Sequence, residues 1–117
     1  MTDPDDTRLP SLTVQHTFLF EELLALLIGT LDIDSSTNCL VVRTPSAERP
    51  FDVAWPLGST IAIRDGIPAL IDATGQTVAH VGDEVSVGGG WISTTTAGVT
   101  SCTGQDHVWV GHHPRRI

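Results

Sequence analysis

The stretch from Ala73 to Ile92, ATGQTVAHVGDEVSVGGGWI, constrains the fold most because it reads as strand, turn, strand and then three glycines. Residues 77–81 are short and β-favouring, and a Thr-Gly-Gln turn signal precedes them. Alternation resumes at Glu84 after a Gly-Asp break and places Val85 and Val87 on one face of a second strand. The pattern is typical of a β-meander, around which a small barrel or sandwich can form.

The glycine run 88–90 favours a tight corner or bulge of a small barrel, because glycine lets the backbone bend sharply. A phosphate-binding loop is the competing interpretation. It fails because the run contains neither GxGxxG nor a lysine-bearing loop. A Gly-Asp-x-Val turn also occurs in carrier domains, but the acceptor lysine is absent here.

Short β-favouring runs separated by turn signals continue along the rest of the chain. Residues 34–38 form a turn, and Cys39 to Arg43 is the returning strand of a hairpin. Residues 51–55 alternate, with Phe51, Val53 and Trp55 facing inward, and a last strand covers residues 107–110. We therefore expect an all-β (mainly β) fold, a small antiparallel barrel or sandwich of about six to eight short strands.

Residues 18–28 are ambiguous because their apolar positions fit both a helical and a β period. One short helix over residues 21–27 is one prediction, since EELLALL is rich in helix formers. The alternative is a long, doubly buried strand that continues to Asp34.

The length of 117 residues predicts one domain. We expect residues 1–11 to be a mobile acidic tail, residues 12–111 a single β-rich domain, and residues 112–117 an exposed tail. The most apolar run is too short and too charged to span a bilayer, and the first residues do not read as a signal peptide. A cytoplasmic location is expected for the chain as given, and export if a leader was removed.

Fourteen acidic residues face six arginines and no lysine, for a net charge of −8. This balance disfavours nucleic-acid partners and anionic membrane surfaces. The missing lysine excludes Schiff-base chemistry and lipoyl or biotinyl attachment, and the sequence indicates no cofactor.

The dense group of possible metal ligands lies near the C-terminus: Cys102, His107 and either His112 or His113. Their spacing matches no zinc pattern, and adjacent histidines in a strand point to opposite faces. Asp32 and Asp34 share a strand face, which suits either a hard cation or a solvent-facing acidic edge.

The two cysteines, Cys39 and Cys102, are either a disulfide candidate or a pair of buried thiols, depending on the compartment. No base or oxyanion motif accompanies them, no serine-nucleophile signature occurs, and His80 has no recognisable partner. The sequence therefore does not indicate an enzyme. Three tryptophans, Trp55, Trp91 and Trp109, are core residues or, if two line an open mouth, a ligand platform.

The segments GTLDIDSSTNCLVV, VAWPLGSTIAI and GQTVAHVGDEVSVGGG, followed by Cys102 and a final VWVG, resemble a group of small, mostly uncharacterised actinobacterial β-rich proteins, some of them lipoprotein-like. The likeness covers about residues 28–111. It implies a compact β-rich domain with Cys39 paired to Cys102, as in lipoprotein relatives of an oxidising compartment. It brings no catalytic residues.

Three hypotheses about function follow. The leading one is a non-enzymatic β-barrel binding or accessory module that contacts a protein partner or a small ligand through its loops and one open end. The second is an acidic immunity- or antitoxin-like protein that neutralises a basic partner. The third is a metal-binding protein that uses the C-terminal His and Cys residues.

Overall fold

The computed structural model describes residues 9–16 and 24–117. Within them the chain forms nine strands and one short helix, which confirms the predicted all-β class. The elements are β1 (Thr13–Val14), β2 (Ala25–Asp34), β3 (Cys39–Arg43), β4 (Phe51–Trp55), β5 (Thr60–Arg64), β6 (Ile67–Ile71), β7 (Thr77–His80), β8 (Glu84–Ser93), α1 (Thr94–Ala97) and β9 (His107–Arg116).

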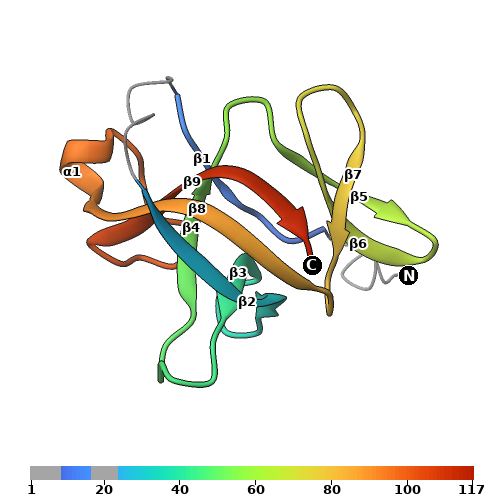
Figure 1. Cartoon of the computed structure of the whole chain (residues 1–117), viewed down its shortest axis with the longest axis horizontal. Coiled ribbons are helices and arrows are strands. Elements are labelled where there is room, and N and C mark those ends of the chain that lie inside the picture. Colours follow the sequence, from blue (N-terminus) through green and yellow to red (C-terminus); the bar gives the residue numbers. More distant parts are fainter. Residues whose placement is uncertain (1–8, 17–23) are drawn as a thin grey trace, which may run out of the picture.

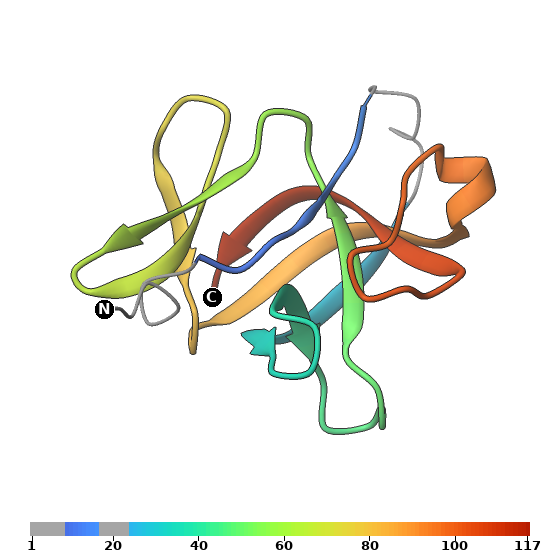
Figure 2. The same ribbon diagram turned by 180° about the vertical axis from the view of Figure 1, so that it is seen from behind.

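Six strands form the larger sheet in the order β1-β4-β3-β2-β8-β9. A further parallel pairing of β4 with β9, Val53 opposite Trp109 and Ala54 opposite Val110, closes this sheet on itself. The result is a barrel-like ring of β4, β3, β2, β8 and β9, with β1 added beside β4. The meander β5-β6-β7 is a separate three-stranded sheet, which projects from one side of the ring in both views (Figures 1 and 2).

Both strands of the predicted meander are present, and Val85 and Val87 are buried as expected, but the two strands do not pair with each other. β7 pairs with β6 in the small sheet, whereas β8 pairs with β2 and β9 in the larger sheet, because the Gly82-Asp83 turn leads from one sheet into the other. The glycine run, however, is not a corner, because β8 continues through it to Ser93. Gly89 has a φ of 144°, and a Cβ there would lie 1.8 Å from the Val110 carbonyl oxygen of β9. Glycine is needed at this position because the two strands approach each other too closely for any side chain.

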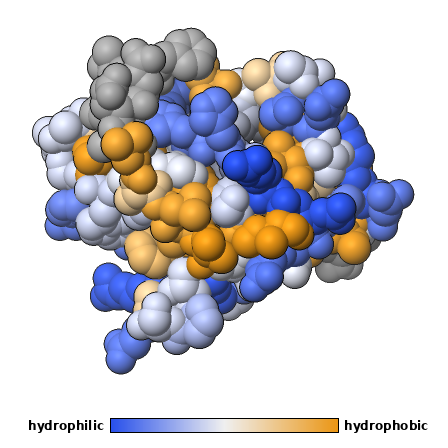
Figure 3. Space-filling model, in the orientation of Figure 1, coloured by the Kyte–Doolittle hydropathy of each residue, from blue (hydrophilic) through white to orange (hydrophobic). Residues whose placement is uncertain are grey.

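The described part of the ambiguous N-terminal stretch, residues 24–28, is extended and not helical, and residues 18–23 lie outside the described residues. β2 is also not doubly buried: Leu27 and Leu31 face the core, whereas Leu24, Leu26 and Ile28 are exposed. Figure 3 shows apolar surface on the face of the molecule where β2 runs in Figure 1.

Residues from both predicted tails take part in the fold. Ser11 already belongs to the fold, since its N–H donates to Asn38 O and its carbonyl accepts from Leu40 N–H. The last strand was expected to end at Val110, but β9 extends to Arg116 along β8. The reason is a local bulge at His113, with a φ of 50°, which keeps the strands paired where the register shifts.

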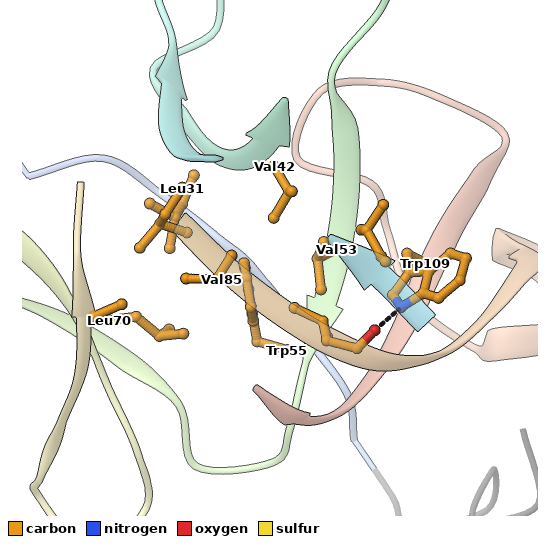
Figure 4. Close-up of a cluster of buried hydrophobic side chains, with 11 residues drawn as sticks. Leu31, Val42, Val53, Trp55, Leu70, Val85 and Trp109 are labelled. Carbon is orange, nitrogen blue, oxygen red and sulfur yellow. Dashed lines mark hydrogen bonds between the residues drawn. The ribbon is translucent and has the colours of Figure 1, made fainter. Parts of the chain in front are cut away.

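The main core fills the ring and reaches the small sheet, which adds Leu70 and Ala79 to side chains from β2, β3, β4, β8 and β9 (Figure 4). β4 contributes Val53 and Trp55 as predicted. The alternate β4 residues Asp52 and Ala54 are equally buried, because the segment between β8 and β9 covers their face.

Candidate functional site

The inward-facing side chains of β8 extend to the candidate site. Because side chains alternate along a strand, Val85, Val87, Gly89 and Trp91 share one face. The first three are buried, whereas Trp91 is 45% exposed because it reaches the open end of the ring. Gly89 leaves room for the Trp109 indole, whose Nε1 donates to the carbonyls of Val87 at 3.2 Å and Gly88 at 3.3 Å.

An aromatic cluster surrounds Trp91 at this end. Its indole is stacked with the His107 ring, with centroids 5.7 Å apart and an interplanar angle of 22°. Phe51 of β4 meets both Trp91 and Trp109 edge-to-face, with centroid distances of 5.3 Å and 6.3 Å. The β8–β9 register explains the cluster, since Trp91 lies opposite Trp109 and Ser93 opposite His107.

The rings of Phe51, Trp91 and His107 form one wall of a cleft of about 650 Å³, a size that suits a small ligand. Its rim carries polar side chains from two loops: Arg49 before β4, and Gln105 and Asp106 before β9. Hydrogen bonding to His107, with Nδ1 and Oδ1 3.1 Å apart, and the nearby imidazole charge hold the pKa of Asp106 below its ordinary value. We call Phe51, Trp91, His107, Arg49, Gln105 and Asp106 the aromatic cleft.

The aromatic cleft combines aromatic and polar groups. Flat apolar faces are available for stacking, and the rim offers an amide, a cation and an ionised carboxylate for hydrogen bonds. No Ser, Thr or Cys occurs among the residues that line it.

A buried carboxylate fixes the loop that supplies the Gln105 side of the cleft. Asp52 is fully buried, and its oxygens accept hydrogen bonds from the hydroxyls of Thr13 and Ser101 and from the Thr103 N–H. Ser101 Oγ in turn accepts from the Gln105 N–H at 3.0 Å. A buried charge needs such a set of donors, and here the same donors hold the loop in place.

The disulfide candidate is confirmed: Cys39 and Cys102 are bonded, with a Cα–Cα distance of 6.0 Å. The bond ties the same loop to the start of β3. The Cys102 N–H also donates to Thr13 Oγ1 at 2.9 Å, so the disulfide and the Asp52 network act on adjacent residues.

The three tryptophans have different environments. Trp55 is fully buried in the core and does not line the cleft, and Trp109 is 8% exposed behind Phe51. Of the ligand platform expected from the sequence, the structure thus brings Trp91 to the cleft wall, with Trp109 packed next to it.

The proposed metal set is not assembled. Cys102 is in the disulfide, so its sulfur is not a free thiolate for a metal. Residues 9–16 and 24–117 contain no group of three or more His, Cys, Asp or Glu side chains placed to hold an ion. Asp32 and Asp34 instead face Arg43 across the hairpin, with its Nε 2.7 Å from Asp32 Oδ2 and its Nη2 3.6 Å from Asp34 Oδ1.

His80 has neighbours that the sequence did not reveal. Its Nδ1 lies 3.8 Å from Asp83 Oδ2, and its Nε2 lies 3.6 Å from Asp65 Oδ2. Both distances exceed a normal hydrogen bond, and His80 Nε2 is buried without a hydrogen-bond partner among the described residues.

Sequence reasoning missed Phe51, Arg49, Gln105 and Asp106 as members of the site. Phe51 was assigned to the core from its alternation, and the other three lie in loops whose position depends on the parallel β4–β9 contact. The sequence signal available was the pair of polar loops flanking β4 and β9.

No helix within the described ranges has the length and apolar character needed to cross a membrane. Comparison with protein-family models, with curated proteins and with solved structures found no match to this chain.

Proposed function

We propose that this protein is a non-enzymatic binding module whose aromatic cleft holds a ring of a saccharide. The observation that carries the proposal is the contrast between Trp91, 45% exposed, and the buried Trp55 and Trp109. An indole left open to solvent inside a cleft provides a flat face on which the C–H face of a sugar ring stacks.

The rim supports a polyhydroxylated ligand. The Asp106 carboxylate is 98% exposed and ionised at neutral pH, so it accepts from sugar hydroxyls. Arg49 makes no ion pair with any described residue and donates to hydroxyl or ring oxygens. Stacking on one wall and hydrogen bonds on the rim are the two interactions that orient a ring.

A saccharide array tests the proposal directly. The wild type should bind at least one class of immobilised saccharide, and Trp91→Ala should weaken that binding about tenfold or more, because it removes the stacking face. Leu26→Ala is the matched control, since Leu26 is 61% exposed on β2 and lies outside the cleft. Absence of any saccharide binding, or equal binding by Trp91→Ala, would refute the proposal.

The disulfide supports an oxidising compartment as the place of action, because such bonds persist where thiols are not kept reduced. We propose export on this ground. Peptide mapping of protein from its native source, without reductant, should recover the Cys39–Cys102 cross-linked peptide. Recovery of two free thiols would contradict this.

A role as an acidic partner of a basic protein is the second proposal, and the net charge of −8 favours it. Several of the described carboxylates weigh against this second proposal, because they are buried or paired within the protein and are not available to a basic partner. Asp52 is buried, and Asp32 and Asp34 face Arg43. If this role were the correct one, binding to a basic protein would be salt-sensitive and unaffected by Trp91→Ala.

A further inference from the structure

The strand β5 forms one edge of the small sheet, which projects from the ring (Figures 1 and 2). On one side β5 pairs with β6, from Thr60 opposite Ile71 to Arg64 opposite Ile67, and on the other side no described strand pairs with it. None of its five residues is buried, and Ile63 is 49% exposed. An open strand edge of this kind is a template on which a further strand can form.

The register of the β5–β6 hairpin shows which backbone groups of β5 point away from β6. The two-residue turn after Arg64 makes Arg64 and Ile67 a hydrogen-bonded pair. Hydrogen-bonded and non-hydrogen-bonded pairs alternate along an antiparallel ladder, so every second residue from Arg64 back to Thr60 bonds to β6. Ile61 and Ile63 lie between them and therefore point their N–H and C=O groups outward.

Two hydrogen bonds agree with this assignment. Pro68 lies opposite Ile63 on β6, and its carbonyl accepts from the Val81 N–H, on the side of β6 away from β5. The Ile63 carbonyl accepts from Arg64 Nη1 at 3.4 Å, an exposed bond that is longer than the usual N–H···O limit of about 3.2 Å. The backbone N–H of an added strand can replace such a weak donor.

Arg64 gives the edge a preference for one sign of charge. Its guanidinium makes no ion pair with any residue in the described ranges. The adjacent Asp65 lies instead towards β7, with its Oδ2 3.6 Å from His80 Nε2. A carboxylate carried by an added strand would therefore find Arg64 available for a charge-assisted hydrogen bond.

A second copy of this chain does not supply that carboxylate. When two β5 strands pair through their outward residues about a twofold axis, Ile61 lies opposite Ile63 of the second copy, and Arg64 lies opposite Thr60 of the second copy. Each copy also carries a net charge of −8, which opposes their association. The edge therefore favours a strand from a different chain.

We propose that the β5 edge is a docking site for an extended segment of another protein, which adds as an antiparallel strand and brings a carboxylate to Arg64. Antiparallel pairs are the commoner kind, and strand addition to an open edge is a recurring mode of peptide recognition. Ile61 packs against the main core, and Ile63 shares its face, so apolar residues belong opposite these two. The site shares no residue with the aromatic cleft and is independent of the saccharide proposal.

The probe is a capped hexapeptide, acetyl-Ser-Glu-Val-Thr-Val-Ser-amide, whose glutamate would lie opposite Arg64. It should bind saturably in an amide NMR titration, with the largest shifts at Ile61 and Ile63. N-methylation of the first valine, opposite Ile63, removes the N–H donor and should weaken binding about tenfold or more. N-methylation of the threonine is the matched control, because its N–H would point away from β5, and it should change the affinity less than twofold.

Variants of the protein test the same contacts from the other side. Ile63→Pro removes the outward N–H and should abolish peptide binding, while the circular dichroism spectrum stays that of the wild type because this N–H does not bond to β6. Ile63→Val is its control and should keep the affinity within about threefold. Arg64→Gln should weaken binding by about two- to fivefold, as expected for an exposed ion pair.

Several results would overturn the proposal. They are no binding of the peptide, equal effects of the two N-methylations, and NMR shifts confined to the aromatic cleft or to β2. Sedimentation of the wild type without peptide gives a further test. A dimer that Ile63→Pro abolishes would show that the edge belongs to a second copy of the chain and would likewise overturn the proposal.

Discussion

Removing the Cys39–Cys102 bond by the double substitution Cys39→Ala, Cys102→Ala should lower the free energy of unfolding by roughly 4 kcal/mol. The bond joins residues 63 positions apart. For a loop of that size, the chain-entropy treatment gives about 14 cal/mol/K of entropy removed from the unfolded chain, which is about 4 kcal/mol at 25 °C. A chain of 117 residues has a total stability of about 6–17 kcal/mol, so the loss is large but leaves room for a folded variant.

Urea denaturation followed by tryptophan fluorescence measures this loss. With a slope of about 2 kcal/mol/M, the midpoint should fall by about 2 M. The wild type in reductant should match the double variant, and the double variant itself should not respond to reductant. A fall in the urea midpoint of less than about 0.5 M would refute the expected contribution of the disulfide. The loop that carries Cys102 would then be held by the Asp52 network alone.

Three further substitutions test separate parts of the fold. Asp52→Ala should cost about 3 kcal/mol or more in urea denaturation, because it leaves buried hydroxyl and N–H donors without an acceptor; a loss below 1 kcal/mol would contradict this. Gly89→Ala should lower the free energy of unfolding by on the order of 3 kcal/mol, since its Cβ would meet a backbone carbonyl. Gly88→Ala is the control: the nearest atom to its Cβ is 3.5 Å away, so it should lower the free energy of unfolding by less than half as much. Equal losses of stability would argue against the close approach of the two strands at Gly89. The hydroxyl of Thr37 and other hydrogen bonds hold the pKa of Asp34 below its ordinary 3.8. The ionised Asp34 carboxylate therefore stabilises the fold at pH values above 3.8, and this stabilisation is lost as the pH falls through the lowered pKa. Asp34→Asn should therefore be less stable than the wild type at pH 6, and the difference should vanish towards pH 2; a constant difference would show that the charge is not responsible.

The local signals in the sequence predicted much of the fold. The hairpin of β2 and β3 and the burial of Val85 and Val87 followed from turn residues and alternation. The reason is physical: a β period of two and a turn signal are properties of neighbouring residues, which the sequence displays directly.

The remaining features depend on residues far apart in the chain. Asp52 alternates outward on β4, yet the segment before β9 buries it, and that burial follows from a contact between residues 49 to 51 positions apart. The aromatic cleft likewise requires the parallel contact of β4 with β9, which no local sequence pattern encodes. The extension of β9 to Arg116 depended on the bulge at His113, a residue whose positive φ the sequence did not indicate.

The most direct test of the aromatic cleft as the ligand site is an NMR titration that follows the three indole N–H signals as a saccharide from the array is added. We predict that the Trp91 signal shifts progressively and saturates, while the signal of the fully buried Trp55 stays unchanged. A titration in which Trp91 does not move, or in which Trp55 moves as much, would contradict the assignment of the cleft.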